Sequence, residues 1–364
     1  MAKSPTPISK PSIKTRFLIL SDTHGAKLSL EKHPHLSADV ALHCGDLTEE
    51  SKIAEFRTSL ELLKSINAPL KLVIAGNHDF TLDIPMFKQK IEEVRPVLQP
   101  SEVAKEYGTF GEARALFQDA KDSGIIFLDE GTHQFTLQNG GALTVYASPY
   151  TPSLSDWGFQ YHPEKGHKFS IEPNTDVVIT HGPPRGVMDL TDSGRRAGCT
   201  DLFAAVARNR PALHCFGHIH EGWGGKLVTW REKITEPPSH FADIDNSKSI
   251  VIENLRKLRR STFDDEEEAQ LKAKKAESYT REGCCSISYC AQDQLQLQRG
   301  RQTLFVNAAL EDIEEQSMHL PWLVDVELYR ACDVLPKIET SDQNRKRSLP
   351  EDEQDLRPTK KTSQ

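Results

Sequence analysis

Gly217-His218-Ile219-His220 follows the apolar run 213–216 and places two histidines two residues apart. In an extended loop, residues i and i+2 point to the same side, so both imidazoles can reach one point in space. Ligand sites in open sheets lie beyond the carboxyl ends of strands. The stretch therefore predicts a buried strand and, directly after it, a loop that supplies ligands to a metal.

Four further motifs share this arrangement of an apolar run followed by ligand-type side chains. They are Asp22-Thr23-His24, Gly45-Asp46, Gly76-Asn77-His78-Asp79 and Thr180-His181-Gly182. The runs before them, 17–20, 40–43, 72–75 and 177–180, predict short buried strands. Because loops converge beyond rigid strands, we expect seven side chains to form a two-metal site: Asp22, His24, Asp46, Asn77, His181, His218 and His220.

The chemistry of these seven side chains limits the choice of metal. Two carboxylates, one amide oxygen and four imidazoles form a mixed oxygen and nitrogen set without thiolate, which argues against a structural zinc knuckle or an iron–sulfur cluster. Mn, Fe, Zn or Ni fits this set better. Two divalent ions beside two carboxylates leave an excess of about two positive charges. Such a site suits an anionic, phosphate-like substrate.

The order of the motifs, D-x-H, GD, GNH[DE], H and GHxH, resembles that of the calcineurin-like metallophosphoesterases. The resemblance covers residues 16 to about 230 and the strands expected near 303–328. Segments 147–152, 180–184 and 217–224 resemble the metallophosphoesterase-domain-containing branch more closely, and some members of that branch are cyclic nucleotide phosphodiesterases. The resemblance implies a four-layer α/β/β/α sandwich of two mixed sheets flanked by helices.

The resemblance also implies a role for each residue of the site. One metal would be held by Asp22, His24 and His220, and the other by Asn77, His181 and His218, with Asp46 bridging them. A metal-bridging water would attack phosphorus, while His78 would protonate the leaving oxygen or stabilise the transition state. Manganese is the ion favoured in vitro. The orientation of His78 is open, because the usual carboxylate partner is missing and the adjacent Asp79 need not face it.

The residues after Asp46 narrow the substrate. Protein serine/threonine phosphatases of this fold carry an aspartate and an arginine soon after the GD motif, whereas here the next arginine is Arg57. We therefore expect a phosphodiesterase for small substrates, including cyclic nucleotide-like ones. The alternatives are a phosphomonoesterase or nuclease of the same fold, and a non-catalytic metal-bound scaffold that recruits partners.

Two further groups are candidate substrate contacts. Trp157 lies in the aromatic segment 150–161, which could stack on a nucleobase or simply anchor a long loop onto the core. Arg185, Arg195 and Arg196 follow the His181 motif and could clamp a phosphate, or lie in solvent as ordinary surface residues.

Helices at 53–63, 111–122 and 200–209, with Thr48 as a possible N-cap of the first, alternate with the strands. Further strands near 143, 226, 304 and 322 predict a second sheet and an α/β domain. We expect a disordered segment at 1–15, a catalytic domain at 16–335, a charged and mostly disordered insertion at about 231–300, and a polar tail at 336–364. The insertion is a candidate docking segment for a protein partner.

Charge and composition exclude several classes of partner. The net charge is −8, and the core carries no long stripe of Lys or Arg, so we expect no stable nucleic-acid complex. No run approaches the ~18 apolar residues of a membrane helix, so no membrane role is expected. Seven scattered cysteines favour a reducing compartment, which indicates a cytoplasmic protein. The basic clusters at 345–347 and 360–361 offer nuclear import as an alternative.

Overall fold

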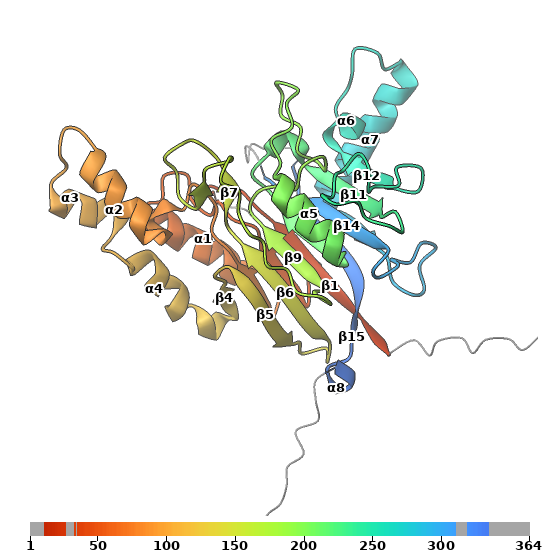
Figure 1. The fold of residues 1–364 in the computed structure, drawn as a ribbon, viewed down its shortest axis with the longest axis horizontal. Coiled ribbons are helices and arrows are strands. Elements are labelled where there is room, and N and C mark those ends of the chain that lie inside the picture. The colour runs from red at the N-terminus through yellow and green to blue at the C-terminus, as the bar shows by residue number, and fades with distance from the viewer. Residues whose placement is uncertain (1–10, 27–32, 34, 311–318, 335–364) are drawn as a thin grey trace, which may run out of the picture.

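The computed structural model describes residues 11–26, 33, 35–310 and 319–334. Two mixed β-sheets form the centre of the molecule (Figure 1). In spatial order, the first sheet contains β13 (Cys285–Ser288), β15 (Trp322–Tyr329), β1 (Ser12–Leu20), β2 (Val40–His43), β3 (Leu70–Val73) and β4 (Ile125–Phe127). The second contains β12 (Ile250–Asn254), β11 (Gly224–Thr229), β14 (Gln302–Asn307), β10 (Leu213–Phe216), β9 (Val177–Thr180), β6 (Ala142–Ser148) and β5 (Gly131–Thr136).

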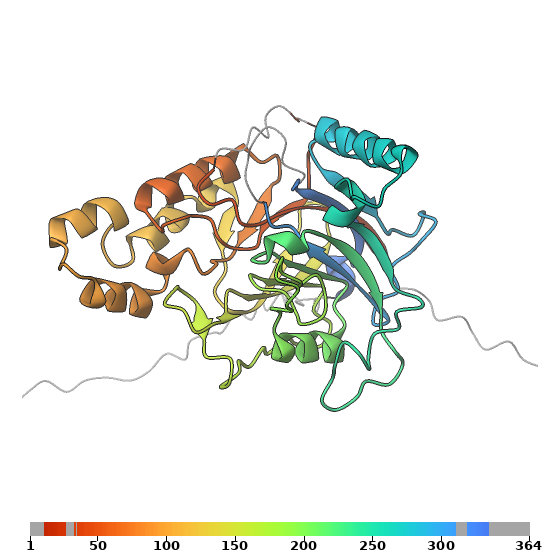
Figure 2. The same cartoon turned by 90° about the horizontal axis from the view of Figure 1, so that it is seen from above.

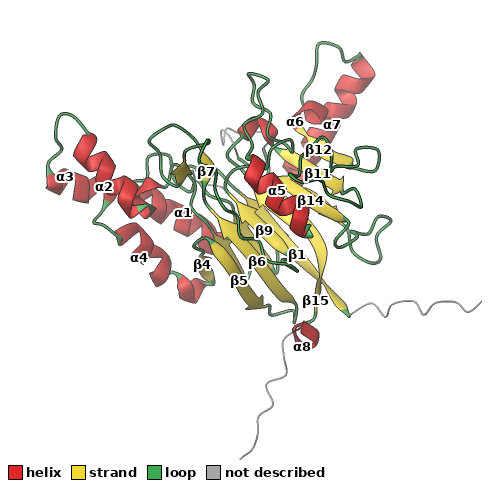
Figure 3. Ribbon diagram, viewed as in Figure 1, coloured by secondary structure: helices red, strands yellow, loops and turns green. Residues whose placement is uncertain are grey.

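Helices cover the outer faces of the sheets, and a short two-stranded ribbon lies apart from both. The helices are α1 (Ile53–Ser65), α2 (Ile84–Glu93), α3 (Pro100–Tyr107), α4 (Glu112–Asp119), α5 (Thr200–Asn209), α6 (Leu255–Leu258), α7 (Glu266–Glu282) and α8 (Ala331–Val334). The ribbon pairs β7 (Thr151–Pro152) with β8 (Gln160–Tyr161). Figure 3 shows the strands in the middle and the helices outside.

Three apolar layers hold the sandwich together. The largest lies between the two sheets and includes Phe17, Val145 and Trp322. A second packs α1 and α4 on the first sheet, and a third packs α5 on the second sheet through Phe203. Figure 2 shows the sheets and helices from above. The predicted four-layer α/β fold is confirmed, since helices flank two mixed sheets.

The strands that carry the motifs run parallel to one another. β1, β2 and β3 pair in parallel register in the first sheet, and β9 and β10 do so in the second. Their carboxyl ends therefore lie at one edge, where five polar loops follow. The predicted strands 40–43, 177–180 and 213–216 match β2, β9 and β10 in both bounds. β1 begins at Ser12, so residues 12–15, which were expected to be disordered, belong to a strand. Residues 1–10 of that predicted segment lie outside the described residues.

The start of α1 differs from the prediction. The helix begins at Ile53, after Lys52, and the Glu55 side chain accepts a hydrogen bond from the Lys52 N–H at 2.8 Å. Thr48 does not cap it. Its hydroxyl donates a hydrogen bond to the Asp79 carboxylate at 2.7 Å instead, so the Thr48 side chain links two loops at the sheet edge.

Residues 231–300 also differ from the prediction of a mostly disordered insertion. They contain α6, α7, β12 and β13, and the two strands extend both sheets: β12 pairs with β11 and β13 with β15. Leu258 and Tyr289 are buried in the layer between the sheets. Charged residues cover the outside of this segment, which explains its polar composition, while a few apolar side chains fix it to the core. The tail expected at 336–364, with its basic clusters, lies outside the described residues.

The part of the chain that the structure describes contains no helix long and apolar enough to cross a membrane. Helices α2, α3 and α4 extend from one end of the sandwich (Figure 1). The α2–α3 pair has an apolar centre of its own, in which Phe80, Phe87 and Val103 are buried. This centre is separate from the three layers of the sandwich and lies next to the loop that carries His78.

Candidate metal centre

The structure brings the predicted ligands together in overlapping clusters. One ligand atom each from Asp22, His24 and His220 lies within 4.8 Å of the others, and the same holds for Asp46, His181 and His218. The Asn77 Oδ1 atom lies 2.9 Å from His181 Nε2, beside the second cluster. The first group is the set assigned to one metal from the sequence, and the second group contains two of the three residues assigned to the other metal together with Asp46, which was assigned as the bridge. A third group, His24, Asp46 and His78, joins them.

Backbone strain concentrates at these positions. Asp22, His24, Asp46 and His218 have φ of 55°, 47°, 51° and 67°, which is the left-handed region that side chains disfavour. Strain of this kind costs on the order of 1–3 kcal/mol per residue and persists only where the surroundings impose it. Hydrogen bonds between loops do so here, because the N–H of Asp22 donates to Gly45 and that of His24 to Asp46.

Backbone carbonyls select the ring nitrogen that faces the cluster. His181 Nδ1 lies 3.0 Å from the carbonyl oxygen of Cys44, and His24 Nδ1 lies 3.2 Å from that of Thr48. A neutral imidazole that donates through Nδ1 keeps the lone pair of Nε2 free for a metal. The Nε2 atom of His24 is buried and has no hydrogen-bond partner among the described residues.

Electrostatic coupling between the acids and the histidines is strong. The His218 N–H donates to both carboxylate oxygens of Asp22 at 3.0 Å. Burial disfavours the charged form of His181, but the carboxylates of Asp46 and Asp22 outweigh it and raise its pKa to about 9. Burial and the nearby His181 lower the pKa of His218 to about 4. The cluster therefore places buried carboxylates next to imidazoles. Bound cations would offset the negative charge of the carboxylates and accept the lone pairs of the imidazoles.

Glycines let the loops approach these carboxylates. A Cβ atom on Gly76 would overlap the Asp46 side chain, and one on Gly217 would overlap that of Asp22. The motif glycines are thus required by close packing against the two acids.

These observations show that the side chains present fit divalent cations. The donor set is mixed oxygen and nitrogen, the atoms converge, and the orphaned nitrogen of His24 faces the cluster. A cavity of about 330 Å³ lies there, and its lining consists of His24, Asp46, Asn77, His78, His218, His220 and Glu221. The identity and number of the metals stay predictions.

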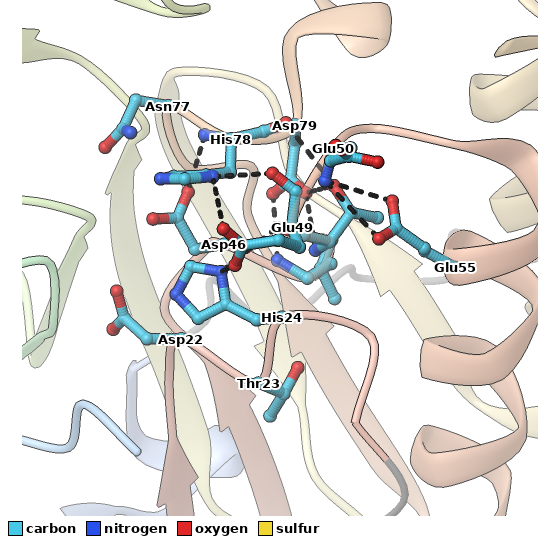
Figure 4. Close-up of polar contacts among 12 residues, drawn as sticks. Asp22, Thr23, His24, Asp46, Glu49, Glu50, Glu55, Asn77, His78 and Asp79 are labelled. Carbon is cyan, nitrogen blue, oxygen red and sulfur yellow. Dashed lines mark hydrogen bonds and ion pairs between the residues drawn. The ribbon is translucent and has the colours of Figure 1, made fainter. Parts of the chain in front are cut away.

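Glu49 is a residue of the site that sequence reasoning missed (Figure 4). Its backbone carbonyl lies 2.6 Å from His78 Nδ1, and its carboxylate lies 2.9 Å from His24 Nδ1. This carbonyl orients His78, because the Nδ1–H group donates a hydrogen bond to it and the Nε2 atom stays available for proton transfer. No motif could reveal this contact, because any residue supplies a carbonyl.

Asp79, the residue after His78, has a structural role. Its carboxylate accepts hydrogen bonds from the N–H groups of Gly76, Leu47 and Thr48 at 2.9, 3.1 and 3.0 Å, besides the Thr48 hydroxyl. Burial and the Asp46 charge raise the pKa of Asp79 to about 7, whereas the four donors favour its charged form. Asp79 therefore ties the GD loop to the GNHD loop.

Replacing Asp79 with Ala should lower the free energy of unfolding by about 3 kcal/mol or more, because three buried N–H donors lose their acceptor. Urea denaturation followed by circular dichroism measures the loss. Asp122→Ala, at an exposed position, is the matched control and should stay within about 0.5 kcal/mol of the wild type. Equal stabilities for the two variants would contradict the role assigned to Asp79.

The candidate substrate contacts fall in different places. Trp157 stacks on His78, with ring centroids 4.3 Å apart and an angle of 29° between the planes. Arg196 pairs with Asp189 at 2.6 Å, and Arg185 donates to the carbonyl of Arg196. Arg195 is exposed. None of the three arginines is among the described residues that line the site cavity, so the phosphate clamp stays a prediction without support from the geometry.

Comparison with known proteins agrees with this site. The family model described as calcineurin-like phosphoesterase matches residues 15–222, more than half of the chain. The chain therefore belongs to the calcineurin-like phosphoesterase family. This membership supports a metal-dependent hydrolase of phosphoesters and implies divalent cations at the cluster.

Named relatives point to the same branch. The chain is 33% identical over 220 residues to the human metallophosphoesterase domain-containing protein 1, a match that covers 59% of this chain and 63% of that protein. It is 31% identical over 233 residues to the UPF0046 protein T07D4.2 of Caenorhabditis elegans, covering 60% of this chain and 54% of that protein. The chain thus spans less than two thirds of the length of these relatives. The chain is 17% identical to the phosphopantetheinyl hydrolase PptH from Mycobacterium tuberculosis in its solved structure, with a TM-score of 0.36, and the match covers 62% of this chain and 86% of that chain.

Proposed function

We propose that this chain is a phosphodiesterase that hydrolyses small, nucleotide-like phosphodiesters, cyclic ones included, with two divalent cations bound at the cluster. Asp22, His24 and His220 would hold one cation, and Asn77, His181 and His218 the other, with Asp46 between them. Cations bound there would acidify an attacking water and polarise the phosphoryl oxygens.

The lining of the site cavity carries the preference for a diester. Its described residues include no Lys or Arg, and they do include the acidic Glu221. A phosphomonoester carries a charge of about −1.5 to −2 at neutral pH, whereas a diester carries a single negative charge. When Glu221 is counted with Asp22 and Asp46, two divalent cations leave an excess of about one positive charge, which matches the single charge of a diester better than the charge of a monoester.

His78 is the candidate general acid. Its backbone N–H donates to the Asp46 carboxylate at 2.8 Å, and its Nδ1 is fixed by the Glu49 carbonyl, so the ring stands at the edge of the metal cluster with Nε2 available. Protonation of a leaving oxygen by a positioned imidazole contributes typically about 10²–10⁴-fold in rate. The side chain is 22% exposed, so it can exchange protons with water.

Hydrolysis of two chromogenic esters tests the proposal. The metal-stripped protein should be inactive, and added Mn²⁺ should restore cleavage of bis-p-nitrophenyl phosphate faster than that of p-nitrophenyl phosphate. His78→Ala should lower kcat for the diester by about 100-fold or more. His162→Ala, at an exposed histidine outside the site, should leave kcat unchanged.

Other results would select the alternatives. Faster cleavage of the monoester would identify a phosphomonoesterase with the same centre. No cleavage of either ester with any divalent metal would favour a metal-bound scaffold.

A further inference from the structure

An apolar cavity of about 400 Å³ lies beside the metal cluster and is separate from the cavity that the ligands line. Residues of α2, α3 and the segments next to them form its wall, among them Phe87, Val94, Leu98 and Val103. Its volume falls within the range of about 300–1,000 Å³ typical of small-molecule sites.

Trp157 contacts both this cavity and His78, which lies at the edge of the metal cluster. It lines the cavity, and it stacks on His78 with the ring centroids 4.3 Å apart. Its loop is fixed, because the Gly158 N–H donates to the Asn77 carbonyl at 3.0 Å and the Phe159 N–H donates to Asp83 at 2.9 Å. Trp157 therefore contacts both the candidate general acid and the apolar cavity, and hydrogen bonds from the backbone N–H groups after it fix its position.

The charged residues of the lining are Glu50, Lys90, Glu93 and Asp156, and with three carboxylates to one ammonium group they do not form an anion site. The Lys90 ammonium group lies 3.3 Å from Asp156 and 5.0 Å from the ring centroids of both Phe80 and Trp157. Its charge is therefore already offset by a carboxylate and two aromatic faces. The cavity suits an uncharged, flat and largely apolar group, which the tryptophan and phenylalanine rings can contact.

We propose that this cavity binds an uncharged aromatic group attached to the leaving oxygen of the phosphodiester. The assignment rests on the proposed function, because it places the leaving group on the His78 side. In the reaction, water forms the new P–O bond, and the P–O bond to the leaving group breaks with its electron pair on that oxygen. The leaving oxygen takes a proton from His78, and a proton from the water restores His78. An acyclic diester releases the alcohol that carries the aromatic group together with a phosphomonoester, and a cyclic diester opens to a single phosphomonoester.

A nucleobase and an aryl alcohol share this chemistry, and binding to the metal-free, full-length protein separates them. Adenosine and 2-naphthol are each titrated by calorimetry into the wild type and two variants. Leu98→Glu places a charge in the cavity wall, whereas Val97→Glu, at a neighbour that is 72% exposed and outside the wall, is the matched control. At least one probe should bind the wild type and Val97→Glu equally, and Leu98→Glu at least 10-fold more weakly. No binding to the wild type, or equal binding to all three proteins, would overturn the proposal.

Kinetics with Mn²⁺ then tests whether the cavity serves the reaction. The probe that binds should inhibit cleavage of bis-p-nitrophenyl phosphate competitively. Inhibition that higher diester concentrations do not relieve would show that the cavity does not bind the leaving group, and it would overturn the assignment. If the protein cleaves the diester but binds neither probe, the proposed ligand of the cavity is refuted and the proposed function is not. Binding without diester cleavage would refute the proposed function and the leaving-group role that depends on it.

Discussion

Asp46→Asn should reduce turnover of a phosphodiester by more than about 100-fold, which exceeds the usual loss from residues that only support metal ligands. Asp46 belongs to two of the three clusters, its Oδ2 lies 3.1 Å from His181 Nε2, and only 2% of the residue is exposed. An amide of the same shape keeps an acceptor for the His78 N–H but removes the charge. The loss should therefore appear in kcat without a loss of fold.

Two measurements check this prediction. Circular dichroism should give the same spectrum for Asp46→Asn and the wild type. Added Mn²⁺ should raise the unfolding temperature of the wild type, since a ligand at 100 times its Kd stabilises by about 2.7 kcal/mol, and it should raise that of the variant much less. Asp122→Asn is the control with the same change at an exposed position. Near-normal activity and metal response in Asp46→Asn would refute the site assignment.

Replacing residues 231–300 with a short linker should prevent cooperative folding. The deletion removes β12 from one sheet and β13 from the other, and it uncovers the layer between the sheets, where Leu258, Cys285 and Tyr289 are buried. We expect aggregated protein, or soluble protein that lacks a sharp thermal transition. A folded and active deletion variant would show that these strands are dispensable.

A pair of point variants tests the same contacts without a large deletion. Leu258 in α6 is 3% exposed, whereas Leu271 in α7 is 68% exposed. Leu258→Ala should cost about 2–5 kcal/mol of unfolding free energy, because it leaves a cavity in the core. Leu271→Ala should change stability by less than about 0.5 kcal/mol. Similar values for the two variants would argue that the segment is only loosely attached.

The sequence predicted the central strands and the grouping of the ligands because both depend on local patterns. Short apolar runs mark β2, β9 and β10, and the polar residues directly after them must meet at one sheet edge. The prediction for residues 231–300 was wrong, because their average composition is charged although single apolar residues among them are buried. Burial there depends on single residues such as Leu258, which pair with partners far away in the sequence.

The contacts around His78 could not be predicted for a different reason. Its orientation depends on a backbone carbonyl at Glu49, which carries no sequence signal. Asp79 is the sequence neighbour of the candidate general acid His78, yet its side chain turns toward the GD loop, because three N–H groups converge there. Trp157 was expected to meet a substrate or to anchor a loop, and its stacking on His78 depends on long-range packing.

The stacking of Trp157 on His78 also supplies an optical reporter for the site. Of the four tryptophans, Trp223, Trp230 and Trp322 are at most 4% exposed and lie in the packed layers. Trp157 also lines the adjoining cavity, so its emission should change when a ligand enters there, and occupancy can be read in unlabelled protein.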